Sequence, residues 1–266
     1  MAWFDSLTHV TRDGSWMGER HCDASLRKLL ADMQDGDVRR ACLVSIADYV
    51  DNEVILESAQ AYPDRFVPIA GLNPRPLPTL RRVEAAVAQV AKHGFAGIKL
   101  HPRLNGYDPL DAKCLAAIDA AGRHGLVILL DTLFRRRGLA TRYAPDVIDA
   151  IVEACPESKI VLLHATGTTM LDMYEIVRAS DNLILDFSFT LMRYRGSSRL
   201  DADMNFLFRT TDQLISIGSD FPEYSPRATM QRFTELSEGV EPHRIENITH
   251  GNLDRLFAHY RVPARD

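Results

Sequence analysis

The chain has 266 residues, a formal net charge of −5 at pH 7 and 46% hydrophobic residues. A chain of this length buries most of its unfolded surface, which allows a large core. Its mild acidity gives no reason to expect a nucleic acid or a membrane as a partner, and no apolar run approaches the roughly 20 residues of a membrane-spanning helix.

The cysteines and the first residues indicate a cytoplasmic protein. The four cysteines are far apart and form no C-x-x-C pair: Cys22, Cys42, Cys114 and Cys155. This spacing is typical of reduced thiols in the cytoplasm. The opening segment MAWFDSLTH has no basic region followed by an apolar stretch, as a secretory signal has. The sequence leaves open whether the chain forms a homo-oligomer.

Short apolar runs rich in β-branched residues recur along the chain and predict strands. They cover residues 3–7, 41–46, 66–72, 97–100, 126–131, 159–164, 183–187 and 214–218. Most of these runs are continuous rather than alternating, which is typical of parallel strands covered on both faces. Segments with helical periodicity lie between them, at 25–33, 80–94, 111–125 and 146–156.

Strands separated by helices in this way predict an α/β fold, a single (β/α)₈ TIM barrel over residues 1–266. The competing doubly wound sheet would be favoured by a G-x-G-x-x-G motif or a P-loop, and the sequence has neither. No linker rich in proline, glycine or serine divides the chain. From about residue 240 the pattern indicates a loop and a closing helix over 252–260, a short C-terminal helical extension.

Residues that bind ligands or carry protons stand at the carboxyl ends of six expected strands. They are Asp5 and His9, Lys99 and His101, Asp131, His164, Asp186 and Asp220. A TIM barrel holds its active site at these strand ends. We therefore expect the set to converge on one mouth at one end of the barrel.

Two groups of arginines follow the fifth and seventh expected strands. They are Arg135, Arg136 and Arg137, and then Arg193, Arg195 and Arg199. One such run usually means a solvated loop. Two basic loops on the same face of an acidic protein favour an anionic small-molecule substrate held by guanidinium–carboxylate pairs.

Seven segments carry a resemblance to a known family. They are FDSLTH (4–9), HCDASLRKLL (21–30), AYPDRFVPIAGLNP (61–74), GFAGIKLHPRLNGYDP (94–109), KIVLLHATG (159–167), ISIGSDFP (215–222) and NITHGNLDRLF (247–257). Taken in this order, over nearly the whole chain, they resemble amidohydrolase-related proteins. The resemblance is to the branch of that superfamily with aminocarboxymuconate semialdehyde decarboxylase and metal-independent lactonases.

The resemblance implies a barrel that commonly holds one divalent metal, often zinc. Its usual ligands are a His-x-His pair on the first strand, a histidine ending the fifth and an aspartate after the eighth. In this sequence His9 and Asp220 match, and His164 matches a histidine that assists the chemistry. Leu7 stands at the first histidine position, and Asp131 stands where the fifth-strand histidine is expected.

Three interpretations of this altered site are open. In the first, His9, Asp131 and Asp220 hold a divalent metal, which is zinc or, because carboxylates favour harder ions, manganese. In the second, the site is metal-free and works by acid–base catalysis, as the resemblance to some lactonases implies. In the third, the metal site has degraded and the chain is a non-catalytic binding protein.

The resemblance favours a hydrolase that cleaves a lactone, ester or amide bond of a small anionic metabolite. Asp220 would activate water, and His164 would polarise the carbonyl or protonate the leaving group. The expected substrate contacts are His101, Lys99, Arg135, Arg193 and Arg195. A non-oxidative decarboxylase of an unsaturated or aromatic acid is the alternative, because a lyase of this kind would use the same residues.

Overall fold

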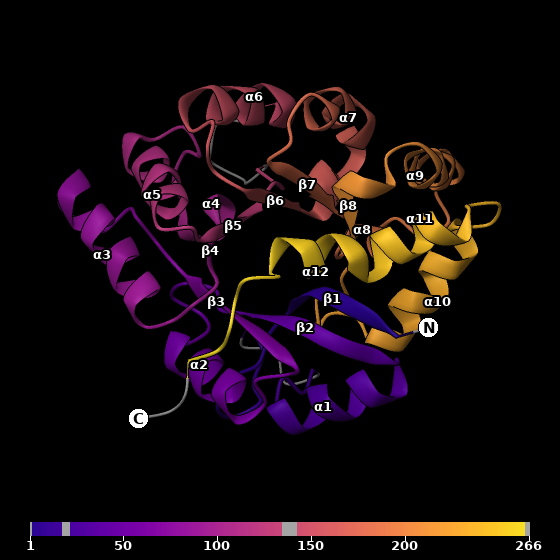
Figure 1. Ribbon diagram of the computed structural model, residues 1–266, viewed down its shortest axis with the longest axis horizontal. Coiled ribbons are helices and arrows are strands. Elements are labelled where there is room, and N and C mark those ends of the chain that lie inside the picture. The colour runs from indigo at the N-terminus through magenta and orange to yellow at the C-terminus, as the bar shows by residue number, and fades with distance from the viewer. Residues whose placement is uncertain (1, 18–21, 135–142, 264–266) are drawn as a thin grey trace.

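The computed structural model of the protein describes residues 2–17, 22–134 and 143–263. Its eight strands are parallel and follow one another in sequence order within one sheet. They are β1 (Trp3–Thr8), β2 (Val38–Val44), β3 (Phe66–Gly71), β4 (Gly97–Leu100), β5 (Val127–Asp131), β6 (Ile160–Leu163), β7 (Leu183–Asp186) and β8 (Ile215–Ser216). Figure 1 shows the strands at the centre and the helices around them, so the predicted (β/α)₈ barrel is confirmed.

The barrel closes between β1 and the segment that follows β8. The backbone N–H of Asp220 donates to the carbonyl of Leu7 at 2.9 Å, and the N–H of His9 donates to the carbonyl of Phe221 at 2.9 Å. Thr8 and Phe221 also form an isolated parallel bridge. His9 and Asp220 thus belong to the same seam, which places these two expected site residues beside each other.

Helices cover the outside of the barrel. The longer ones are α1 (Leu26–Asp35), α2 (Asn52–Ala61), α3 (Leu80–Lys92), α5 (Ala112–Arg123), α6 (Ala144–Ala154), α7 (Met170–Arg178), α9 (Ser198–Thr210) and α10 (Pro226–Leu236). The sequence supplies their caps: the side chains of Ser25, Thr79 and Asp111 accept hydrogen bonds from backbone N–H groups in the first turns. No helix among the described residues is long and apolar enough to cross a membrane.

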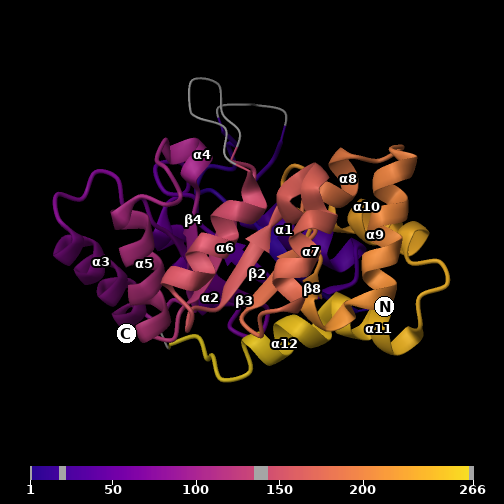
Figure 2. The same cartoon turned by 90° about the horizontal axis from the view of Figure 1, so that it is seen from above.

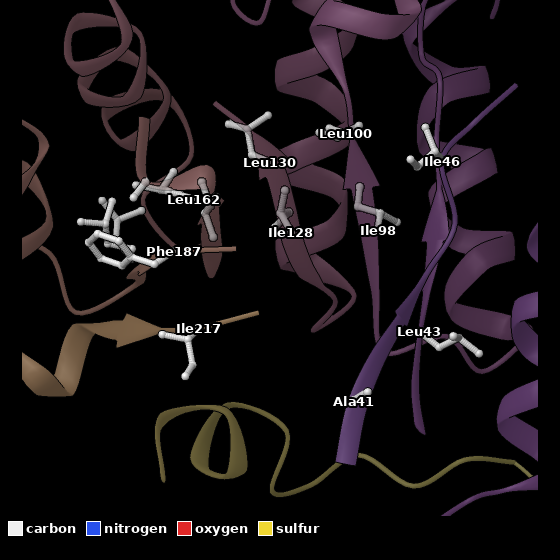
Figure 3. Close-up of a cluster of buried hydrophobic side chains, with 14 of the residues drawn as sticks. Ala41, Leu43, Ile46, Ile98, Leu100, Ile128, Leu130, Leu162, Phe187 and Ile217 are labelled. Carbon is white, nitrogen blue, oxygen red and sulfur yellow. The ribbon is translucent and has the colours of Figure 1, made fainter. Parts of the chain in front are cut away.

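The core has two layers because successive side chains of a strand point to opposite faces. One layer lies between the strands and the helices, and Figure 3 shows Ile98 and Leu100 of β4 and Ile128 and Leu130 of β5 in it. The other layer fills the barrel interior. It includes Phe4, Leu7, Val44, Ile69, Leu129, Val161 and Leu163.

The C-terminal extension closes one end of the barrel. It contains α11 (Pro242–Glu246) and α12 (Asn252–Leu256), and the ring of Phe257 lies 6.2 Å from that of Phe4 in the barrel interior. In Figure 2 these two helices lie on the opposite side of the molecule from the short helices α4 (Pro102–Asn105) and α8 (Thr190–Arg193). The predicted helical extension is therefore confirmed, and the carboxyl ends of the strands are left for the site.

Candidate active site

A cavity of ≈ 410 Å³ lies at the carboxyl ends of the strands. This volume suits a small metabolite. Its lining contains most of the expected site residues, namely His9, Lys99, His101, His164, Arg193 and Asp220. These residues come from different strand ends and loops, and in the structure they line one cavity. Arg103, Glu223 and Tyr224 also line the cavity and were not singled out from the sequence.

His9 and Asp220 form a close pair in the cavity. Nδ1 of His9 donates to the carbonyl of Val44 at 2.6 Å, so its Nε2 faces the site as an acceptor. This Nε2 lies 3.4 Å from Oδ1 of Asp220 and 3.5 Å from Nζ of Lys99. The indole of Trp16 stacks on the His9 ring at 5.1 Å between centroids. Burial and the nearby Lys99 amine lower the pKa of His9, which favours the neutral ring.

Asp131 is fully buried and is absent from the cavity lining. Its Oδ2 lies 3.3 Å from Nε2 of His101, 3.2 Å from Nε2 of His164 and 3.6 Å from Nη2 of Arg103. Burial alone would raise the pKa of Asp131, but its interactions with these neighbours lower it below the usual range. Asp131 is thus a buried anion behind the histidines.

The sequence did carry a signal for Arg103, which follows the motif KLHP directly.

The environment of His164 favours its charged form. Its Nδ1 lies 3.1 Å from the carbonyl of Ser188, while its Nε2 faces Asp131. Burial lowers the pKa of His164, but its close contact with Asp131 and the charges of Asp131 and Asp220 raise it above its ordinary value. His164 is therefore a proton donor at the cavity wall. The neighbouring His101 is the opposite case, since burial lowers its pKa to about 3.

The backbone at both expected catalytic residues is strained. His164 has φ +66° and Asp220 has φ +57°, in the left-handed region that non-glycine residues avoid. Surrounding hydrogen bonds hold the first of these turns, where the Thr190 hydroxyl donates to the carbonyl of His164 at 2.6 Å. Such strain collects at functional sites, where a side chain must be aimed in one direction.

The arginines expected at the mouth have different positions. Arg193 lines the cavity, and its guanidinium lies 6.0 Å from the centre of the Phe189 ring. Arg195 does not line it and instead pairs with Glu235 at 2.9 Å. Arg135 falls outside the described residues, as do Arg136 and Arg137.

Comparison with known proteins identifies the family. The amidohydrolase family matches residues 17–245 of the chain. The chain belongs to the amidohydrolases. No curated protein is similar enough to the chain to count as a match.

Solved structures share the fold of this amidohydrolase at low sequence identity. An uncharacterized TIM-barrel protein from Bordetella bronchiseptica has a TM-score of 0.78 at 18% identity, over 97% of this chain and 99% of that one. An amidohydrolase from Burkholderia multivorans with bound zinc has a TM-score of 0.71 at 15% identity, over 97% and 99%. The 5-carboxyvanillate decarboxylase from Sphingomonas paucimobilis has a TM-score of 0.66 at 14% identity, over 97% and 99%. The match of the amidohydrolase family to residues 17–245 confirms the predicted superfamily.

Two other carboxylates at the strand ends hold the barrel together. Asp5 accepts hydrogen bonds from the backbone and the hydroxyl of Ser219, at 2.8 and 2.6 Å. Asp186 accepts from the Ser216 hydroxyl at 2.7 Å and from the backbone of Ser188 at 3.0 Å. Neither aspartate lines the cavity. In this amidohydrolase both act between strands, Asp5 across the closing seam and Asp186 between β7 and β8.

Asp5 gives the fold a pH dependence that mutation can remove. Burial raises its pKa from 3.8 to about 7, against the hydrogen bonds from Ser219, which lower it. The folded protein therefore binds the proton of Asp5 more tightly than the unfolded chain does. The stability that protonated Asp5 contributes is complete below pH 3.8 and is lost as pH rises through about 7. We expect Asp5→Asn to flatten the fall in stability over this range. Urea unfolding at several pH values measures it, and identical pH profiles for parent and variant would contradict the assignment.

The donors in the cavity do not fit a divalent metal ion. Among residues 2–17, 22–134 and 143–263, no group of three or more His, Cys, Asp or Glu side chains is arranged to hold one. His9 and Asp220 are neighbours, but Asp131 faces His101 and His164 instead of joining them. The expected set of His9, Asp131 and Asp220 is therefore not gathered around one point. Leu7 packs in the barrel interior and offers no ligand.

Proposed function

We propose that this amidohydrolase hydrolyses a lactone, ester or amide bond of a small anionic metabolite in the ≈ 410 Å³ cavity. One observation carries the proposal. The carboxylate of Asp220 and the ring of His164 line the same cavity from different strand ends. A base and a proton donor on two sides of one cavity are what carbonyl hydrolysis requires.

Asp220 and His164 divide the proton transfers between them. Asp220 accepts a proton from water while the water oxygen attacks the carbonyl carbon. The bond from that carbon to the leaving oxygen or nitrogen then breaks, and His164 gives the leaving atom the Nε2 proton that otherwise faces Asp131. The raised pKa of His164 favours its charged form, and Asp131 lies behind the ring to stabilise the positive charge.

The charges that line the cavity favour an anionic substrate. Lys99, Arg103 and Arg193 supply positive charge to the lining. Of the two carboxylates there, Glu223 already accepts a hydrogen bond from Nε1 of Trp16 at 2.7 Å. A substrate carboxylate would find two guanidinium groups, which bind carboxylates with good geometry.

Arg193 and Arg195 offer a matched test of anion binding. We expect Arg193→Met to raise KM for the anionic substrate by roughly 3- to 30-fold with little change in kcat, because it removes a charge-assisted contact at an exposed rim. Arg195→Met removes the same charge from a residue that pairs with Glu235 away from the cavity, so its KM should stay unchanged. Steady-state kinetics of both variants give the answer, and equal effects on KM would reject a specific contact of Arg193.

Non-oxidative decarboxylation is a second candidate. The similarity of the fold to the decarboxylase from Sphingomonas paucimobilis favours it, although 14% identity extends only to the fold. In that reaction the bond to the carboxylate carbon breaks, carbon dioxide leaves, and His164 would protonate the carbon left behind. The same charged ring then serves a lyase rather than a hydrolase.

Isotope labelling distinguishes the two reactions. The purified protein is assayed with a panel of carboxylate-bearing lactones, esters and amides and with aromatic and unsaturated acids. Hydrolysis in H₂¹⁸O places one ¹⁸O atom in the acid product. Decarboxylation in D₂O releases carbon dioxide and places one deuterium on carbon. Turnover of neither class, together with binding of panel members, would replace both proposals by a non-catalytic binding role.

A further inference from the structure

The His9–Asp220 pair has the spacing of two zinc ligands. Nε2 of His9 and Oδ1 of Asp220 are 3.4 Å apart. Two zinc ligands at about 2.0–2.1 Å in tetrahedral geometry are separated by roughly 3.3–3.4 Å. A hydrogen bond to the Val44 carbonyl fixes Nδ1 of His9, and Trp16 stacks on the ring. The orientation of Nε2 is therefore fixed.

A lysine amine lies beside the histidine of this pair. Nζ of Lys99 is 3.5 Å from Nε2 of His9, and the side chain lines the cavity although it is only 2% exposed. A lysine ammonium only donates hydrogen bonds, and Nε2 of His9 is the acceptor of the ring. Burial lowers the pKa of Lys99 below its ordinary value, and the nearby carboxylates of Asp220 and Asp131 oppose this shift.

We propose that the amine of Lys99 takes the place of a divalent cation at the His9–Asp220 pair and keeps metal ions out of the site. Such an amine places positive charge inside the protein beside the two groups that would bind a metal. A second cation brought to the same pair meets repulsion at short range in a buried environment. The amine also offers hydrogen-bond donors to a substrate oxygen in the cavity. This inference concerns the same site as the proposed function, but it is tested without any substrate.

Zinc binding tests the inference directly. The parent, Lys99→Met and Arg193→Met are titrated with Zn²⁺ alone by calorimetry, and the metal content of each purified protein is measured by mass spectrometry. Methionine keeps the length of the lysine side chain without its charge. Arg193→Met is the matched control, since it removes one positive charge from the same cavity at a residue that does not contact His9.

We expect Lys99→Met to bind Zn²⁺ roughly tenfold or more tightly than the parent, and Arg193→Met to behave as the parent does. Lys99→Gln, a second uncharged variant, should repeat the gain if Lys99→Met folds poorly. Equal affinity of the parent and both uncharged variants would overturn the inference, and so would tighter binding by the parent, because the amine would then be a ligand. An equal gain in Arg193→Met would overturn it too, by showing a general effect of charge. None of these results would bear on whether the parent hydrolyses an anionic substrate.

Discussion

Replacement of Asp220 by asparagine is expected to lower turnover by about 10²–10⁴-fold, the usual cost of losing a general base. Asparagine keeps the shape of the side chain but cannot accept a proton from water. Burial by itself would raise the pKa of Asp220, but the positive charges of His164 and Lys99 help to lower it to about 2. The base is therefore ionised throughout the neutral range. The loss on substitution should accordingly be the same at every pH from about 5 to 8.

The measurement is kcat of Asp220→Asn and of the parent, on whichever substrate the labelled assays reveal. His164→Asn serves as the comparison, because it removes the proton donor and should change the alkaline side of the pH profile as well as the rate. Unfolding curves for both variants check that each remains folded. Turnover by Asp220→Asn close to that of the parent would exclude Asp220 as the base and leave a binding role or another site.

Replacement of Asp131 by asparagine is expected to destabilise the fold by about 3–5 kcal/mol, the usual cost of removing one partner of a buried ion pair. The variant leaves the charged ring of His164 without its anion, and the guanidinium of Arg103 loses the same neighbour. Asp131 has a lowered pKa in the folded state. Its contribution to stability is therefore full above pH 3.8, the ordinary pKa, and is lost as pH falls further.

Asp186→Asn is the control for this experiment. Asp186 is as fully buried as Asp131, but its hydrogen bonds come from uncharged groups and burial raises its pKa. Its replacement removes no ion pair, so it should cost less than Asp131→Asn at pH 7. Urea unfolding gives the free energies, and NMR titration should show a lower pKa for His164 in Asp131→Asn. If the two variants lose equal stability and His164 titrates as before, Asp131 is not its counter-ion.

The sequence by itself determined the barrel and predicted where the candidate site lies. Continuous apolar runs between amphipathic helices predicted each strand of the barrel, and the bounds of β4 agree with the expected residues 97–100. Because parallel strands of a barrel all end on the same side, residues at those ends had to share one mouth. His9, His164 and Asp220 were found in this way, and all three line the cavity.

The tertiary structure alone decided which of these side chains meet. A strand's periodicity shows on which face a residue lies, but the partner across the barrel depends on register and closure. The position of Asp131 predicted a third metal ligand, yet Asp131 lies outside the cavity lining and contacts two histidines and an arginine of that lining. Lys99 contacts His9 from a residue 90 positions away in the chain. Arg195, two residues after the end of α8, pairs with Glu235 of α10, 40 positions away in the chain. These contacts join distant segments, and only the closed barrel brings such segments together.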